Sequence, residues 1–141
     1  MKTTIIGLLL LATASVNAQE KAQTYQLADA PRYSEETGYG YDLVATPEKG
    51  SKAPFFFSVR VPDGNYQVTV RLGSKKQAGV TTVRGESRRL FIDNLATKKG
   101  QFVDETFIIN KRNPRISEKE SVRIKPREKA KLNWDDKLTL E

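Results

Sequence analysis

Histidine and cysteine are both absent from this sequence of 141 residues. Without histidine the chain cannot form a Ser-His-Asp triad, use a histidine general base or bind zinc through imidazole. Without cysteine it has no thiol nucleophile, no disulfide and no lipid anchor on a cysteine that follows a signal peptide. Catalysis by carboxylates alone is still compatible with this composition. The two absences therefore weigh against an enzyme without excluding one.

Long apolar runs are also scarce. The one near the N-terminus, Ile5 to Ala12, follows the positive charge of Lys2 and precedes the small-residue segment 16–18. This order is typical of a signal peptide, and the run is much shorter than the about 20 residues that cross a membrane. We therefore predict a signal peptide over residues 1–18, export to the periplasm or the extracellular space, and no membrane partner.

The formal net charge of +7 is concentrated in one segment. Between Lys111 and Lys131 there are nine basic residues and three acidic ones, a pattern that can bind a polyanion. Nucleic acid is not the expected partner, because no aromatic residues for base stacking are interleaved and because export is predicted. An acidic pectic polysaccharide fits better, and a solvated loop or a contact with another domain is the structural alternative. The candidate contact residues are Lys111, Arg112 and Arg115.

Residues 55–73 show the clearest local pattern. Apolar and polar side chains alternate in residues 66–72, which is the period of a half-buried antiparallel strand. Residues 55–61 alternate less cleanly, and Pro62 to Asn65 has the composition of a tight turn. We therefore predict two strands joined as a hairpin.

Further short strands are expected at a spacing of roughly ten residues, with turn residues between them. No segment shows helical periodicity over three turns. One all-β domain over residues 19–141, a sandwich or barrel, is therefore predicted. The last pattern stops at Glu141, so we expect a truncated C-terminal end. The further strands are expected at 39–44, 80–84, 89–93, 106–110, 121–125 and 138–140.

Tyr39, Tyr41 and Trp134 are candidates for a carbohydrate-binding platform. Pyranose rings present C–H faces that pack on aromatic rings, while Tyr and Trp keep a polar group for hydrogen bonding. The alternative is that the rings fill the core and that Gly38 and Gly40 permit close backbone approach.

Arg84, Arg88 and Arg89 form a second candidate group for carbohydrate binding. Guanidinium groups bind carboxylates in a bidentate manner, so these arginines could hold a uronate or an acidic protein surface. The alternative is a structural network in which Glu86 and Asp93 pair with them.

The acidic residues do not predict a metal or catalytic site. Asp135 and Asp136 would point to opposite faces of a strand, and no EF-hand spacing is present. No two acids stand out as a glycosidase pair, and no serine lies in a G-x-S-x-G setting. We therefore predict no metal, no cofactor and no catalytic residue.

Several longer motifs resemble one bacterial family. They include Gly38 to Leu43, Phe57 to Tyr66, Ala78 to Arg84, Glu86 to Leu90, Asn110 to Pro114 and Lys131 to Asp135. Together they resemble the N-terminal β-sandwich of rhamnogalacturonan acetylesterases from gut Bacteroidetes, over nearly all of the chain after residue 18. Segments 80–90 and 110–114 are the more specific ones, because malectin-like and galactose-binding-like modules share the 57–66 pattern.

The resemblance implies a galactose-binding-like jelly-roll β-sandwich, which would lack its last strand if the chain is truncated at Glu141. In that family the module precedes an SGNH/GDSL-type hydrolase domain, whose serine lies in a Gly-Asp-Ser block and whose base is a histidine. This sequence contains neither, so no catalytic residue carries over and no activity is expected from this chain alone.

The expected function is that of a non-catalytic module of a secreted pectin acetylesterase, which supports the hydrolase domain and could contact acidic polysaccharide. A second hypothesis is a free-standing carbohydrate-binding protein for uronate-containing glycans. A third is a purely structural domain that docks on the esterase through its basic residues. The sequence does not separate the second hypothesis from the third.

Overall fold

The computed structural model describes residues 22–43, 53–126 and 134–141. The predicted signal peptide lies outside these residues, as do the last basic residues of segment 111–131. Within the described ranges, no helix has the length and apolar character of a membrane span.

The described chain is all-β, as predicted, with very little 3-10 helix. Every pairing between named strands is antiparallel. The elements are η1 (Leu27–Asp29), β1 (Tyr39–Asp42), β2 (Phe56–Arg60), β3 (Gly64–Gly73), β4 (Gly79–Gly85), β5 (Arg89–Thr97), β6 (Phe102–Lys111) and β7 (Lys137–Leu140).

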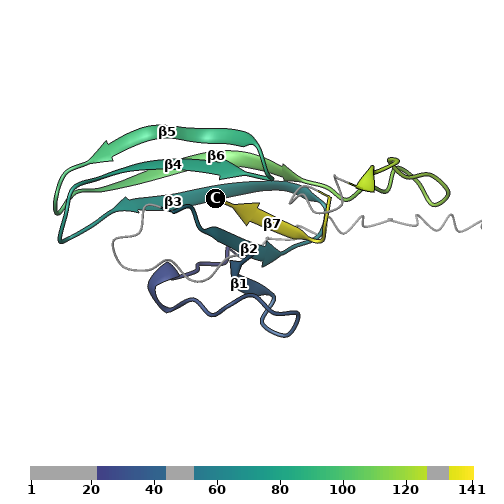
Figure 1. Ribbon diagram of the computed structural model, residues 1–141, viewed down its shortest axis with the longest axis horizontal. Helices are drawn as coiled ribbons and strands as arrows, with labels where there is room; N and C mark the ends of the chain where they lie inside the picture. The colour runs from purple at the N-terminus through teal and green to yellow at the C-terminus, as the bar shows by residue number, and fades with distance from the viewer. Residues whose placement is uncertain (1–21, 44–52, 127–133) are drawn as a thin grey trace, which may run out of the picture.

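The strands form two sheets that pack against each other. The larger sheet has the order β1-β2-β7-β4-β5, and the smaller consists of the long strands β3 and β6 (Figure 1). Phe91 of β5 stacks on Phe107 of β6 with ring centroids 4.3 Å apart, which joins the two layers. The C-terminal strand β7 lies inside the larger sheet, between β2 and β4.

The predicted hairpin of residues 55–73 is wrong in its pairing. Both strands exist, but β2 pairs with β1 and β7, whereas β3 pairs with β6 in the other sheet. The turn after Val61 therefore carries the chain from one layer to the other. Alternation identifies a strand but not its partner, because a partner distant in sequence can match the same pattern.

The predicted strand at 121–125 is also wrong. Ser121 makes only an isolated bridge with Arg115, and the segment that follows β6 projects from the sandwich as a loop (Figure 1). Two apolar residues in a short, basic segment do not provide enough surface to cover a sheet, and Val122 is 38% exposed.

The core lies between the two sheets and is small. Ile109 of β6 is fully buried at its centre. Gly85 leaves the room that this side chain needs, because a Cβ there would lie 2.5 Å from Ile109 Cδ1 and 2.9 Å from Phe91 Cε2. The buried apolar residues are Tyr41, Phe57, Val83, Ile92, Ile109 and Leu138.

A buried polar network holds β1, β2 and β7 in register. Ser58 Oγ donates to Asp42 Oδ2 at 2.9 Å and lies 2.8 Å from Thr139 Oγ1, while Lys137 Nζ donates to Asp42 Oδ2 at 2.6 Å. Burial alone would raise the pKa of Asp42, but the hydrogen bonds from Lys137 and Ser58 outweigh it and lower that pKa. These contacts satisfy polar groups that would otherwise be costly to bury.

Candidate binding surface at one end of the sandwich

One end of the sandwich gathers most of the residues that the sequence singled out. β2, β4 and β6 end there, and β3, β5 and β7 begin there, as the pairs Arg60↔Lys137, Gly85↔Arg89 and Gly64↔Lys111 show. The loop after β6 projects from this end (Figure 1). We call this end the rim.

Trp134 and Arg112 meet at the rim. The guanidinium carbon of Arg112 lies 5.0 Å from the centroid of the Trp134 ring, within the range of a cation–π contact. Trp134 is half-buried and Arg112 is exposed. In the described part of the chain, no carboxylate forms an ion pair with Arg112. An aromatic face and an unneutralised cation therefore lie together.

The three arginines of the second group have separate environments. Arg84 Nη1 lies 3.6 Å from Glu141 Oε1, and Arg89 Nη1 donates to the Asn110 carbonyl at 3.0 Å, which ties β5 to β6. Arg88 is exposed. Of the structural network named as the alternative, the described residues show only the charge of Arg89 acting on Glu86, and no ion pair within 4.0 Å joins Glu86 or Asp93 to the three arginines. Instead, Asp93 accepts a hydrogen bond from Asn94 Nδ2 at 2.8 Å.

Lys111 does not belong to the exposed basic surface, contrary to the prediction. It is 3% exposed, and its Nζ donates to Asp63 Oδ1 at 2.8 Å. This hydrogen bond is the main reason that the pKa of Asp63 is lowered. The position in the sequence could have shown this, because Lys111 follows buried Ile109 by two residues and so shares its face of β6. Arg115 is exposed in the projecting loop.

The burial of Glu86 at the rim was not predicted from the sequence. Glu86 is 4% exposed, and its side chain acts as a strand partner for β7. The Glu86 amide donates to the Thr139 carbonyl at 3.0 Å, and the Thr139 amide donates to Glu86 Oε1 at 3.0 Å. The carboxylate thus continues the ladder beyond the last paired residue of β4.

Burial raises the pKa of Glu86 to about 7. The hydrogen bond from Thr139 opposes that shift, the charge of Asp135 reinforces it, and Arg89 and Lys111 oppose it. Burial likewise raises the pKa of Asp135. Neither Glu86 nor Lys111 is open to solvent, so Glu86 acts here as a partner for the backbone of β7 and is not exposed to a ligand. The residues in the described ranges include no group of three or more potential metal ligands.

The three candidate aromatic residues do not form one platform. Tyr41 is 7% exposed, its ring packs edge-on against Phe55 and Phe57, and its hydroxyl donates to the Leu27 carbonyl at 2.8 Å. The core interpretation therefore fits Tyr41. Tyr39 instead contacts Tyr25, with ring centroids 4.9 Å apart, and lines a hollow of about 530 Å³.

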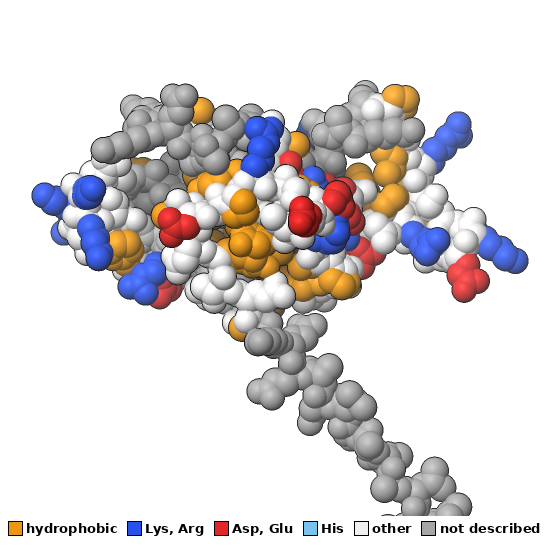
Figure 2. Space-filling view, turned by 90° about the horizontal axis from the view of Figure 1, so that it is seen from below, with side chains coloured by type: hydrophobic (Ala, Val, Ile, Leu, Met, Phe, Trp, Pro, Cys, Tyr) orange, Lys and Arg blue, Asp and Glu red, His pale blue; other side chains and the backbone are white. Residues whose placement is uncertain are grey.

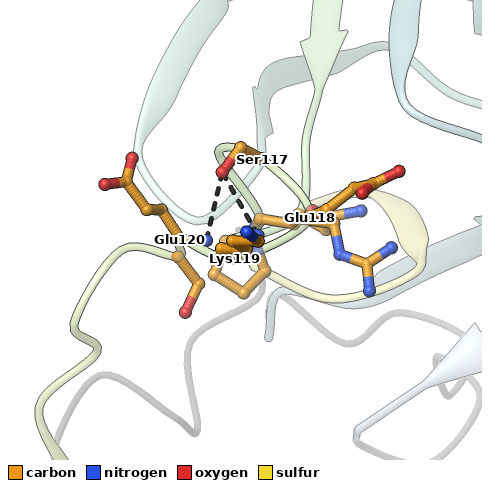
Figure 3. A pocket seen from close by; sticks show the side chains of 8 residues that line it. Ser117, Glu118, Lys119 and Glu120 are labelled. Carbon is orange, nitrogen blue, oxygen red and sulfur yellow. Dashed lines mark hydrogen bonds between the residues drawn. The ribbon is translucent and has the colours of Figure 1, made fainter.

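A second hollow, of about 390 Å³, lies in the projecting loop at residues 113–121. Ser117 Oγ accepts hydrogen bonds from the amides of Lys119 at 3.3 Å and Glu120 at 3.1 Å (Figure 3). The carboxylates of Glu118 and Glu120 point away from each other (Figure 3). This hollow is therefore formed by a tight turn, and its acidic groups do not converge on a common ligand.

No protein-family model, curated protein or solved structure matches this chain. Its function must be inferred from its own residues.

Proposed function

We propose that this chain is a secreted, non-catalytic β-sandwich module that binds acidic polysaccharide of the pectic type and accompanies a rhamnogalacturonan acetylesterase. The contact between Arg112 and Trp134 at the rim carries the binding part of this proposal. The sequence resemblance carries the link to the esterase.

The chemistry of the Arg112–Trp134 pair suits a uronate residue. Arg112 covers one face of the Trp134 ring, so the apolar face of a pyranose would pack on the part of the indole that stays exposed, and the carboxylate of a uronate accepts charge-assisted hydrogen bonds from the guanidinium group. Arg112 has no carboxylate partner in the described ranges, so its charge is open to a ligand. Arg112 also restrains the Trp134 ring, which lowers the entropy lost on binding.

The architecture is compatible with a galactose-binding-like jelly roll, the finer fold that the resemblance implies. Two antiparallel sheets pack face to face, and the C-terminal strand lies inside the larger sheet. The absence of a Gly-Asp-Ser block and of histidine supports a role beside a catalytic domain rather than as one.

Arg112→Ala is expected to weaken binding of trigalacturonate about tenfold, the size of one charge-assisted contact. Trp134→Ala is expected to have a similar effect while the fold survives. Titration calorimetry on the exported chain should show saturable binding that is weaker at about 150 mM than at about 20 mM NaCl, because salt screens exposed charges.

Arg71→Ala is the matched control. Arg71 also lies over an aromatic ring, 5.3 Å from the centroid of Phe102, but its Nε is 3.8 Å from Asp104 Oδ1 and it lies away from the rim. Its removal should leave the affinity unchanged. Equal loss in both arginine variants, or no heat of binding to the folded wild type, would contradict the proposed site.

The projecting loop supports a second candidate role, as a docking arm for the esterase domain. Ile116 is 67% exposed there, beside the cationic side chain of Arg115. Arginine is enriched at protein interfaces, and the buried centres of interfaces are more apolar than the rest of the surface. If this is the main role, the chain should raise the activity of a separately expressed esterase domain, and Ile116→Ser should abolish that gain without affecting sugar binding.

A further inference from the structure

The hollow beside Tyr39 lies between the N-terminal segment and the start of β1. Its walls include two aromatic rings, the side chain of Arg60 and several small polar groups. The lining residues are Gln23, Thr24, Tyr25, Thr37, Gly38, Tyr39 and Arg60. The two tyrosine rings are tilted by 46°, so they form an angled apolar wall.

Local contacts hold this wall in place without a ligand. The Gly38 amide donates to the Ser34 carbonyl at 2.9 Å, and the Arg60 amide donates to the Gly38 carbonyl at 2.7 Å, which fastens the turn to β2. Gly38 has a φ of 70°, a conformation that favours glycine. Tyr25 also packs edge-on against Phe57, with centroids 5.8 Å apart. A ligand would therefore meet rings that are already ordered.

The charge of this hollow differs from that of the Arg112–Trp134 pair. Arg60 Nη2 forms an ion pair with Glu35, and Arg60 Nε lies 3.5 Å from Asp136 Oδ2. One guanidinium therefore faces two carboxylates, and the local net charge is negative. An incoming carboxylate would be repelled, whereas an uncharged hydroxylated ligand would not.

The surface around the hollow carries charges of both signs. Figure 2 looks onto the side of the molecule that carries η1 and β1, where hydrophobic side chains gather in the middle with acidic and basic side chains around them. No single sign of charge dominates that side, so it has no evident preference for a polyanion.

We propose that the Tyr25–Tyr39 hollow binds a neutral pyranose, as a second sugar subsite distinct from the Arg112–Trp134 pair. This inference rests on the proposed carbohydrate-binding function and adds a specificity to it. The tyrosine rings take the C–H face of the sugar, and the polar side chains of the wall accept or donate to its hydroxyl groups. Tyr39 faces Val59 across the sheet, and Val59 faces Leu138 of β7. Both subsites therefore lie at the same end of the larger sheet.

The test is an amide chemical-shift titration of the exported chain with galactotriose and, separately, with trigalacturonate. Galactotriose should shift the amides of Thr24, Gly38 and Tyr39, and trigalacturonate should shift the indole N–H of Trp134. Tyr25→Ala should weaken galactotriose binding about tenfold, within the range found for aromatic stacking, and leave trigalacturonate binding unchanged. Tyr25→Phe keeps the ring and should stay within about twofold of the wild type.

Glu35→Gln tests the charge argument and keeps the proposal falsifiable if Tyr25→Ala does not fold. Glu35 has 78% of its side chain exposed, so the substitution should be tolerated. It leaves Arg60 with one carboxylate and removes the local excess of negative charge, so trigalacturonate should shift the amides of the hollow more in this variant than in the wild type. Four results would overturn the subsite: no galactotriose shifts in the hollow, Tyr25→Ala at full affinity, trigalacturonate bound in the wild-type hollow, or no change in the response of the hollow to trigalacturonate in Glu35→Gln. Loss of trigalacturonate binding at Trp134 alone would instead count against the proposed function.

Discussion

Replacing Glu86 with glutamine is expected to make the protein about 2 to 3 kcal/mol more stable at about pH 8, and to have a much smaller effect at about pH 5. The pKa of Glu86 is raised to about 7 in the folded state from an ordinary value of 4.5. Between these two values the folded state binds more protons than the unfolded state. Wild-type stability therefore falls as the pH rises through this window.

Glutamine removes the charge but keeps the hydrogen bond. Its side-chain oxygen can still accept from the Thr139 amide, so the contact between β4 and β7 survives. The charged neighbours Arg89, Lys111 and Asp135 are unchanged. Glu86→Ala also removes the charge but leaves the buried Thr139 amide without an acceptor, so it should be less stable than Glu86→Gln at both pH values, by about 1 to 3 kcal/mol.

Urea unfolding, followed by the fluorescence of the single tryptophan, measures this effect as a function of pH. The exposed Glu36 provides a control, since Glu36→Gln should keep the wild-type pH profile. The free energy of unfolding of Glu86→Gln should still fall somewhat as the pH rises, because the pKa of Asp135 is raised as well. Asp42 and Asp63 act in the opposite direction, since their pKa values are lowered and their contribution is lost at acidic pH. If the free energy of unfolding of Glu86→Gln depended on pH as steeply as that of the wild type, the role given to this carboxyl group would be contradicted.

Gly40→Ala is expected to destabilise the protein by about 3 kcal/mol or more. Gly40 has a φ of 141°, and an added Cβ would lie 2.3 Å from the Pro31 carbonyl oxygen and 2.7 Å from the Tyr33 nitrogen. The Tyr33 amide donates to the Tyr41 carbonyl and the Tyr41 amide to the Pro31 carbonyl, both at 2.9 Å. Because both nearest atoms belong to the backbone, no side-chain rotation relieves the clash.

Gly79→Ala is the matched control, since a Cβ there would meet nothing within 4 Å. Its effect should be smaller than about 1 kcal/mol. Urea unfolding at one pH is sufficient for this comparison. Similar losses for the two variants would mean that segment 31–33 is not fixed against β1.

The candidate sites show which features the local sequence predicts and which it does not. Trp134 and Arg112 were singled out for separate reasons, one as an aromatic platform and one as a basic contact, and the structure brings them together. Lys111 was assigned to the same basic surface as Arg112, but strand alternation turns the two side chains to opposite faces. Tyr39 and Tyr41 are two residues apart and share a face of β1, but their surroundings differ: Tyr39 lies at the start of the strand beside Tyr25, whereas Tyr41 is buried against Phe55 and Phe57.

The sequence by itself determined the all-β class, most of the strands and the glycines that permit close backbone contact. These follow from alternation and turn composition, which are local properties that a short window of residues contains. Only the tertiary structure decided that β2 and β3 lie in different sheets, that β7 lies between β2 and β4, and that Glu86 is buried. Pairing depends on partners distant in the chain, and burial depends on which sheet faces the residue. For the same reason the Tyr25–Tyr39 hollow is absent from any local pattern: its walls come from three segments that only the fold brings into contact.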